Sequence, residues 1–345
     1  MQKKPARGST IGRLGRVTVL VSLGLGAAGA TAAETWIHPV LSESVVKAAP
    51  AARRGGRGAR PALPARPAPF PTAVSGDTSF VEVTTGESYP EPSSAVPPER
   101  IERAFARLGE GRPMPLTGAK ADGSVTRLEA TWLGQGLATL GLLLAPEGRT
   151  VEAAAFETFL REAGAREAIA LRARKKETKK PARVVTIESA RAFAGVVAPP
   201  RATRTADPAA GRDEALGLPL ELVTGGSPLT LRAGDVLAAT LLRDGRPLAG
   251  ALVRALAPGA KAVLEVETDA HGTVSIPLER EGRLLLSAAS IRRTEKADRT
   301  RGEIWKKADW EVRRTTLELL VLPKVPPKAA PAPKGKRPPA KKKPR

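Results

Sequence analysis

The stretch from Gly217 to Leu256 decides the fold, and it reads GLPLELVTGGSPLTLRAGDVLAATLLRDGRPLAGALVRAL. Three short apolar runs, 218–223, 236–243 and 249–256, are separated in it by turns rich in Gly, Pro and Asp. Further runs of the same kind follow at 262–268, 272–278, 283–290 and 315–322. Short strands with turns every ~8–12 residues are typical of an Ig-like antiparallel β-sandwich. We therefore predict such a sandwich over 214–323.

The residues before this stretch predict a smaller N-terminal half of α+β type. It is a β-rich domain over 76–197 with one or two helices. Polar and apolar residues alternate in Thr78–Thr84, which favours a half-buried strand. Residues 126–132 and 137–144 predict two more strands around a glycine-containing turn. The i, i+4, i+7 spacing of apolar residues predicts a helix over Pro98–Leu108, which begins at a proline.

A second helix is expected after Thr150, which is a residue type that caps helices, and Gly164 is expected to end it. Residues 172–186 are basic and interrupted by proline, and 198–213 are rich in turn-forming residues, so both predict long exposed loops. No strand–helix–strand alternation with a Gly-rich turn is present, which argues against a nucleotide-binding doubly wound fold.

The basic charge is concentrated outside this predicted body. The chain has 345 residues and a formal net charge of +21. Residues 1–32 carry five bases and no acid, 33–75 carry six bases and two acids, and 324–345 carry nine bases and no acid. The body, 76–323, therefore holds only +3, and the high net charge is no sign of a nucleic-acid-binding domain.

The N-terminus predicts a secretory signal peptide. A basic segment, 1–16, precedes an uncharged apolar run, 17–29, and Ala30-Thr31-Ala32 supplies the small residues that signal peptidase recognises. The alternative is a membrane anchor, but the run is shorter than the ~20 residues that a spanning helix needs. We expect cleavage before Ala33 and a periplasmic or secreted protein with no transmembrane segment in the mature chain.

These shifts in composition divide the chain into seven segments. We expect a signal peptide (1–32), an N-terminal strand segment (33–45), a disordered Pro/Arg-rich linker (46–75), the β-rich domain (76–197), a loop (198–213), the Ig-like sandwich (214–323) and a disordered basic Pro/Lys tail (324–345). Linker and tail contain too few apolar residues to offset the entropy lost on ordering them.

The tail is a candidate polyanion-binding segment. Its cations would bind an anionic envelope polymer by releasing counterions, and the alternative is a solvated end without a target. The candidate residues are Lys334, Lys336, Arg337, Lys341, Lys342, Lys343 and Arg345. Because the tail has no aromatic residue to stack on bases, sequence-specific nucleic-acid recognition is not expected.

Catalytic chemistry is poorly represented in the sequence. The chain has no Cys and two His, His38 and His271, and it lacks a G-x-S-x-G nucleophile elbow. We therefore expect a protein that is not an enzyme. Trp132, Trp305 and Trp310 suit either core packing or a sugar-stacking surface, and their spacing favours packing.

Two short motifs in the sandwich and one at the N-terminus lead to a resemblance. The G-x-P-L-x-G motif is formed by Gly245, Pro247, Leu248 and Gly250, and the T-D-x-x-G motif by Thr268, Asp269 and Gly272. Near the expected cleavage site the chain reads AAETW, with Pro39 shortly after. In this order, the motifs resemble a bacterial domain-of-unknown-function family that is grouped with periplasmic components of cobalt/nickel uptake and has an Ig-like C-terminal half.

The resemblance implies an accessory protein of a membrane transport component, with nickel or cobalt as the associated metal. The histidine that the family carries near its mature N-terminus falls on Ala33 here, which leaves His38 as the candidate metal ligand. The residues themselves favour the other interpretation of His38, a partly exposed histidine at a strand edge before Pro39. Nickel and cobalt favour imidazole or thiolate ligands, which this chain almost lacks, so no resident cofactor is expected. For Asp269 and Gly272 the favoured interpretation is a tight turn, in which Asp binds backbone N–H groups and Gly takes a positive φ. We expect a non-catalytic binding or accessory protein, or alternatively an envelope-interaction protein that acts through its basic ends.

Overall fold

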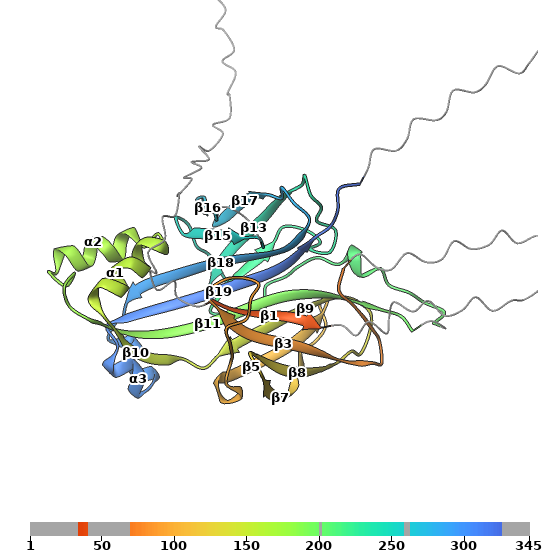
Figure 1. Ribbon diagram of the computed structural model, residues 1–345, viewed down its shortest axis with the longest axis horizontal. Helices are drawn as coiled ribbons and strands as arrows, with labels where there is room; N and C mark the ends of the chain where they lie inside the picture. The colour runs from red at the N-terminus through yellow and green to blue at the C-terminus, as the bar shows by residue number, and fades with distance from the viewer. Residues whose placement is uncertain (1–33, 41–69, 200–201, 259–262, 326–345) are drawn as a thin grey trace, which may run out of the picture.

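A computed structural model describes residues 34–40, 70–199, 202–258 and 263–325. Within these ranges the regular structure is mostly strand, arranged as three sheets with short helices at their margins (Figure 1). The expected mainly β, sandwich-like fold class is confirmed.

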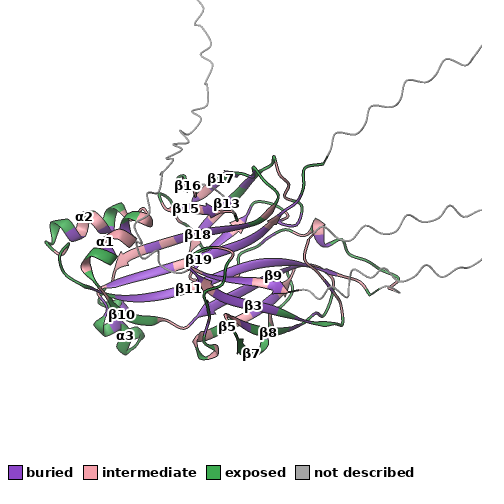
Figure 2. Ribbon diagram, viewed as in Figure 1, coloured by how far each residue is buried: buried purple, intermediate pink, exposed green. Residues whose placement is uncertain are grey.

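A ten-stranded sheet runs through the middle of the molecule. Its strands follow the order β16 (Leu264–Glu267), β15 (Leu252–Leu256), β18 (Gly282–Arg293), β19 (Trp310–Val321), β11 (Ala182–Val197), β9 (Gly136–Leu144), β5 (Ile101–Leu108) and β6 (Met114–Pro115), with β10 (Glu147–Val151) and β2 (Thr72–Val74) also paired to β11. Burial is densest along β19, β11 and β9, at the centre of this sheet (Figure 2).

A four-stranded sheet packs on one face of the central sheet and completes the C-terminal sandwich. It contains β12 (Leu220–Thr224), β13 (Val236–Arg243), β14 (Arg246–Pro247) and β17 (Thr273–Pro277). Leu222 and Leu241 of this sheet share a core with Leu286 and Leu317 of the central sheet. The seven strands predicted from 218 to 322 are therefore confirmed, with bounds shifted by up to five residues.

A five-stranded sheet covers the opposite face of the central sheet. It contains β1 (Glu34–Val40), β3 (Thr78–Gly86), β8 (Val125–Thr131), β7 (Thr117–Asp122) and β4 (Ser94–Ala95). Ala190, Ala192 and Ala194 of β11 belong to the core under this sheet, whereas Phe193 belongs to the sandwich core. Because successive side chains of a strand point to opposite faces, the two smaller sheets lie on opposite sides of β11.

Short helices cover the ends of the central sheet. They are α1 (Ala153–Glu162), α2 (Arg166–Arg174), α3 (Glu303–Lys307) and the 3-10 helices η2 (Pro98–Arg100), η3 (Pro208–Ala210) and η4 (Ala297–Arg301). The helix expected after Thr150 is confirmed as α1, and Gly164 follows it with φ +63°. Thr150 itself lies in β10 and does not cap the helix.

The central sheet continues across the expected boundary at 198–213. Residues Val184–Arg191 of β11 pair in parallel with Trp310–Leu317 of β19, and β19 pairs along its other edge with β18. Strands from the sandwich and from the N-terminal half therefore share one hydrogen-bonded sheet.

Two local expectations are wrong. Residues 98–108 were expected to be helical, but they form η2 followed by β5, which pairs with β9 through a register shift between Ile101 and Arg103. Residues 172–186 were expected to be an exposed loop, but they contain the end of α2 and the start of β11. In both segments tertiary pairing outweighs the local pattern, since pairing and burial decide strand formation.

Other expectations change in detail. The strands expected at 126–132 and 137–144 are present as β8 and β9, but they belong to different sheets. Residues 70–75, at the end of the expected linker, contain β2. The remainder of the linker and the expected signal peptide lie outside the described residues. No helix of the described chain is long and apolar enough to cross a membrane.

Candidate functional site

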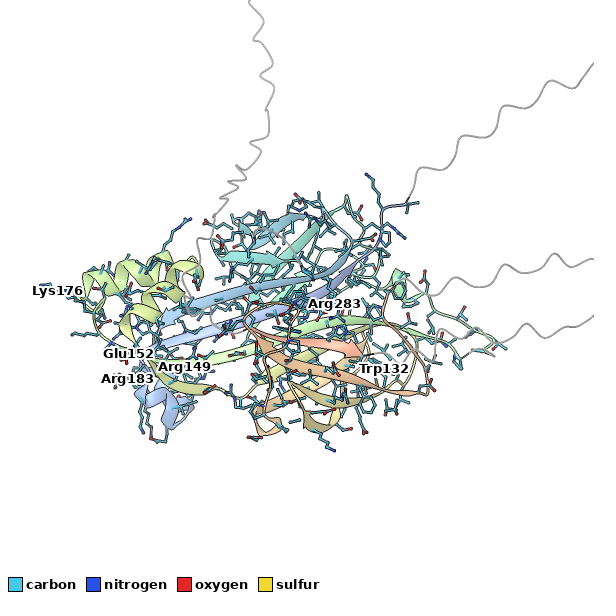
Figure 3. All side chains as sticks on the ribbon, viewed as in Figure 1. Trp132, Arg149, Glu152, Lys176, Arg183 and Arg283 are labelled. Carbon is cyan, nitrogen blue, oxygen red and sulfur yellow. The ribbon has the colours of Figure 1, made fainter. Side chains whose placement is uncertain are left out.

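His38 lies in a polar cluster between β1 and the central sheet. Its Nδ1 is 3.0 Å from Oε1 of Glu318 on β19, and its Nε2 is 2.7 Å from Nη2 of Arg283 on β18. Arg283 Nε lies 3.8 Å from the same Glu318 oxygen. Three charged or titratable side chains from three strands therefore meet at one point, and Figure 3 labels Arg283 at the central sheet near β1.

Strand alternation explains why these residues meet. Glu318 is an even-numbered residue of β19, like Val312 and Thr316, and Thr316 donates a hydrogen bond to the Thr35 carbonyl of β1. Side chains of one parity share one face of a strand, so Glu318 also faces β1. Glu318 is only 5% exposed, and its hydrogen bond from His38 gives the buried carboxylate a partner.

The hydrogen bonds determine the tautomer of His38. A guanidinium keeps its protons and only donates, so Arg283 donates and His38 Nε2 accepts. Nδ1 therefore carries the proton and donates it to the Glu318 carboxylate. The imidazole is neutral in this arrangement, and both of its nitrogens are engaged.

This cluster forms the polar end of a cavity of about 340 Å³. The remaining walls are mostly apolar. Its lining residues are His38, Pro39, Val40, Pro71, Ala192, Phe193, Pro228, Leu229, Arg283, Glu318, Leu319 and Leu320. An apolar cavity with a few convergent polar groups is the usual form of a small-molecule site, and 340 Å³ falls within the ~300–1,000 Å³ of such sites.

Tyr89 closes the cluster from the side of the five-stranded sheet. Its ring packs edge-on against Trp36 of β1, with centroids 5.4 Å apart. Burial, together with the negative charge of Glu318, raises the pKa of the Tyr89 hydroxyl above its ordinary value. The phenol therefore stays protonated beside the carboxylate at neutral pH.

The donor set does not fit nickel or cobalt. Among the described residues, His38 and Glu318 are the only carboxylate or imidazole ligands that line this cavity, and the Arg283 guanidinium lies on the nitrogen that a metal would need. Nowhere in the described ranges do three or more His, Cys, Asp or Glu side chains group as a metal site.

The motif residues lie in turns at one end of the sandwich. Gly245, Gly250 and Gly272 have positive φ, and Pro247 lies in β14. A Cβ on Gly272 would lie 2.8 Å from the Leu248 nitrogen and 3.0 Å from the Pro247 Cβ, so the two motifs pack directly against each other. The geometry makes these residues supports of the fold.

The turn at Asp269 has a carboxylate with local partners. Its Oδ1 accepts hydrogen bonds from the backbone nitrogens of Thr273 (2.8 Å) and His271 (2.9 Å), and these bonds lower the pKa of Asp269. His271 is exposed in this turn. The carboxylate acts within its own turn, as in an Asx-type loop.

The other candidates separate into two groups. Trp132, Trp305 and Trp310 are all at most 2% exposed, which fits packing and leaves no sugar-stacking face. The candidate polyanion-binding residues from Lys334 to Arg345 lie outside the described residues.

Sequence reasoning identified only one member of the cavity's polar cluster. His38 was singled out as one of two histidines, whereas Glu318 and Arg283 were not. They lie 280 and 245 positions from His38, so no local spacing connects them to it. The available signal was the unusual glutamate in the apolar run LELLVL, at 317–322.

Comparisons with known proteins are limited to a family and distant structures. A mutant of Salmonella alpha-2-macroglobulin matches at 11% identity with a TM-score of 0.19, over 72% of this chain and 14% of that one. The D00-D0 domain of intimin matches at 8% identity with a TM-score of 0.15, over 64% of this chain and 89% of that one. The D0-D1 domain of intimin matches at 6% identity with a TM-score of 0.17, over 73% of this chain and 95% of that one.

These scores are too low for the solved structures to carry an argument about fold or function. No curated protein is similar enough to this chain to count as a match. The family described as "Domain of unknown function (DUF4198)" matches residues 72–292, which span most of β2 to β18. The match covers well over half of the chain, and the chain therefore belongs to this family.

Proposed function

We propose that this protein is a non-catalytic periplasmic or secreted binding protein, and that the cavity at His38 holds its ligand. The observation that carries the proposal is the junction of Arg283, His38 and Glu318 at the polar end of an otherwise apolar cavity. Both nitrogens of His38 are held by charged neighbours, which suits a rigid binding wall better than proton transfer. In the finer form of the proposal, the protein serves a membrane transport component associated with cobalt or nickel uptake and holds no metal itself.

The chemistry of the cavity favours a small organic anion with an apolar body. Arg283 is 42% exposed, compared with 21% for His38 and 5% for Glu318, so it is the charged group most accessible to a ligand. A guanidinium binds a carboxylate through paired hydrogen bonds. The prolines and leucines of the remaining walls would bury the apolar body of such a ligand.

A calorimetric titration with matched probes tests the cavity. Hexanoate is expected to bind the full chain, whereas hexylamine, which has the same apolar body and the opposite charge, is expected not to bind. Arg283→Ala should weaken hexanoate binding at least about tenfold, since a charge-assisted pair is lost. Arg246→Ala, in an exposed turn of the sandwich, is the matched control and should change nothing. Equal binding of the two probes, or unchanged binding by Arg283→Ala, overturns the assignment.

A separate titration tests the metal part. Nickel and cobalt at micromolar concentration are expected to give no heat with the full chain, because Arg283 occupies the His38 nitrogen. Heat that disappears in His38→Ala would show that the cavity is a metal site after all.

The basic tail supports a second candidate function, binding to an anionic envelope polymer. The observation is the run of nine bases without an acid in 324–345. Deletion of 324–345 should abolish salt-sensitive binding to lipopolysaccharide, while hexanoate binding remains. Polymer binding that survives the deletion would remove this candidate.

A further inference from the structure

Glu318 brings a hydrogen-bond acceptor to the same end of the cavity at His38 as the Arg283 guanidinium. The residue lines the cavity, and its side chain is only 5% exposed. Its Oε1 accepts the hydrogen bond from His38 Nδ1, whereas its Oε2 is buried and has no hydrogen-bond partner. A buried carboxylate oxygen without a donor is costly, so a ligand that supplies a donor at this point gains affinity.

The Tyr89 hydroxyl lies near this carboxylate and leaves the demand unmet. Its pKa is raised by burial and by the negative charge of Glu318, which places the two groups close together. The phenol oxygen is buried as well, and neither it nor Glu318 Oε2 has a partner in hydrogen-bonding geometry. The polar end of the cavity therefore keeps an acceptor for a ligand.

The charges at the polar end of the cavity cancel. Arg283 carries one positive charge, Glu318 carries one negative charge, and His38 is neutral in the tautomer that its hydrogen bonds determine. A simple carboxylate bound to Arg283 would bring a second negative charge close to Glu318, beside mostly apolar walls. A ligand with a positive group beside its carboxylate avoids this repulsion, because each of its charges then faces an opposite charge of the protein.

The spacing of Arg283 and Glu318 restricts where the ligand carries its positive group. Arg283 Nε lies 3.8 Å from Glu318 Oε1, so the two groups that bind these side chains must also be neighbours in the ligand. An α-amino acid meets this condition, because a single carbon joins its ammonium and carboxylate groups. An ammonium at the far end of an apolar body would instead face walls such as Pro71, Leu229 and Leu319, where a buried charge is costly.

We propose that the cavity at His38 binds an α-amino acid with an apolar side chain, in its zwitterionic form. The carboxylate of the ligand accepts hydrogen bonds from Arg283, its ammonium donates to Glu318 Oε2, and its side chain lies against the apolar walls. A cavity of about 340 Å³ is near the lower end of the range for small-molecule sites, which suits a single amino acid. The inference rests on the binding function proposed for this cavity and names the class of its ligand.

Three six-carbon probes test the proposal: hexanoate, racemic norleucine (2-aminohexanoate) and 6-aminohexanoate. The last two are isomers that carry the same two charges and differ only in where the ammonium is attached. In calorimetric titrations of the full chain at pH 7, norleucine should bind at least about tenfold more tightly than hexanoate, since it adds a charge-assisted hydrogen bond. 6-Aminohexanoate should bind more weakly than hexanoate, because its ammonium would enter the apolar part of the cavity.

Glu318→Gln should affect norleucine and hexanoate differently. The amide keeps the size of the side chain and removes its negative charge. Norleucine should therefore lose its advantage, while hexanoate should bind at least as tightly as it does to the unaltered chain, which also shows that the variant is folded. Glu303→Gln is the matched control, because the Glu303 side chain is 75% exposed on α3, and it should preserve both affinities.

The three probes separate a failure of this inference from a failure of the proposed function. Norleucine that binds no more tightly than hexanoate, or 6-aminohexanoate that binds as tightly as norleucine, overturns the amino-acid assignment, while hexanoate binding still supports an anion site. A norleucine advantage that survives in Glu318→Gln overturns the role given to Glu318. If none of the three probes binds, the function proposed for the cavity falls together with this inference.

Discussion

Buried acidic residues determine much of the polar structure at the scale of single residues. Glu311 of β19 is fully buried, and guanidiniums of Arg243, Arg292 and Arg313 lie within 3.4 Å of its carboxylate. Asp298 extends this cluster, because Arg292 donates two hydrogen bonds to its oxygens at 2.6 and 2.7 Å. Such paired charges are tolerated in the interior because each keeps its partner, and removal of one partner is costly.

Asp298 gives the cluster a pH dependence. Hydrogen bonds from Arg292 lower the pKa of Asp298 from 3.8 to about 2. A lowered pKa stabilises the fold above about pH 4, and that contribution is lost as pH falls through 2. Asp298→Asn should lower the free energy of unfolding by about 2 kcal/mol at pH 7 and by much less near pH 2. Urea denaturation at both pH values measures the effect. Asp77→Asn, at an exposed turn, should show no such difference between the two pH values.

At the scale of elements, the α1–α2 hairpin shows what local patterns can and cannot predict. The spacing of Phe156 and Leu160 predicts α1 because both residues bury on one face against Trp310 and Val184. The basic residues of 172–186 predict a solvated loop, and the end of α2 was therefore missed. In the structure Arg172 is buried, at 1% exposure, and donates to the Glu177 and Lys180 carbonyls. Composition alone does not distinguish a buried charged residue that binds loop carbonyls from a charged residue in solvent.

Strand β5 is the complementary case. The apolar residues of PERIERAFARL have helical spacing, yet Ile101–Leu108 forms a strand that pairs with β9. The C-terminal strands were predictable because their alternation and their turns agree. The partners of His38 were not, because they meet only through the layer packing of β1, β18 and β19.

Phe156 should be the residue on which the hairpin depends most. It is 1% exposed, its ring lies 5.8 Å from Trp310, and the Arg172 guanidinium lies 5.0 Å above it. Phe156→Ala should reduce the free energy of unfolding by about 3–5 kcal/mol. Phe159→Ala is the control, since Phe159 is only half-buried in the same helix and should cost clearly less. Equal costs, read from urea denaturation midpoints, would contradict the packing described.

At the scale of the whole molecule, the shared central sheet ties the two halves together. Leu137 and Phe193 of the N-terminal half belong to the sandwich core. Arg191 of β11 donates to the Leu222 carbonyl at 2.6 Å and to Asp213 at 2.5 Å, so polar contacts also cross the boundary.

A fragment of residues 214–323 should therefore not fold by itself. It would expose the edge of β19 that pairs with β11 and would lose Leu137 and Phe193 from its core. We expect broad, non-cooperative thermal unfolding and dimerisation or aggregation of the fragment. A chain of residues 33–325 should melt cooperatively. A sharp melt and dispersed NMR spectrum for 214–323 would contradict this expectation.

The position of β19 has a consequence for the timing of folding. It is the last strand of the described chain, yet it lies between β18 and β11 at the middle of the central sheet. The edge of β11 that pairs with β19 therefore has no partner until a strand more than a hundred residues later has been synthesised. Long-range parallel pairing of this kind forms slowly. A nascent chain therefore cannot complete the central sheet until β19 has been synthesised.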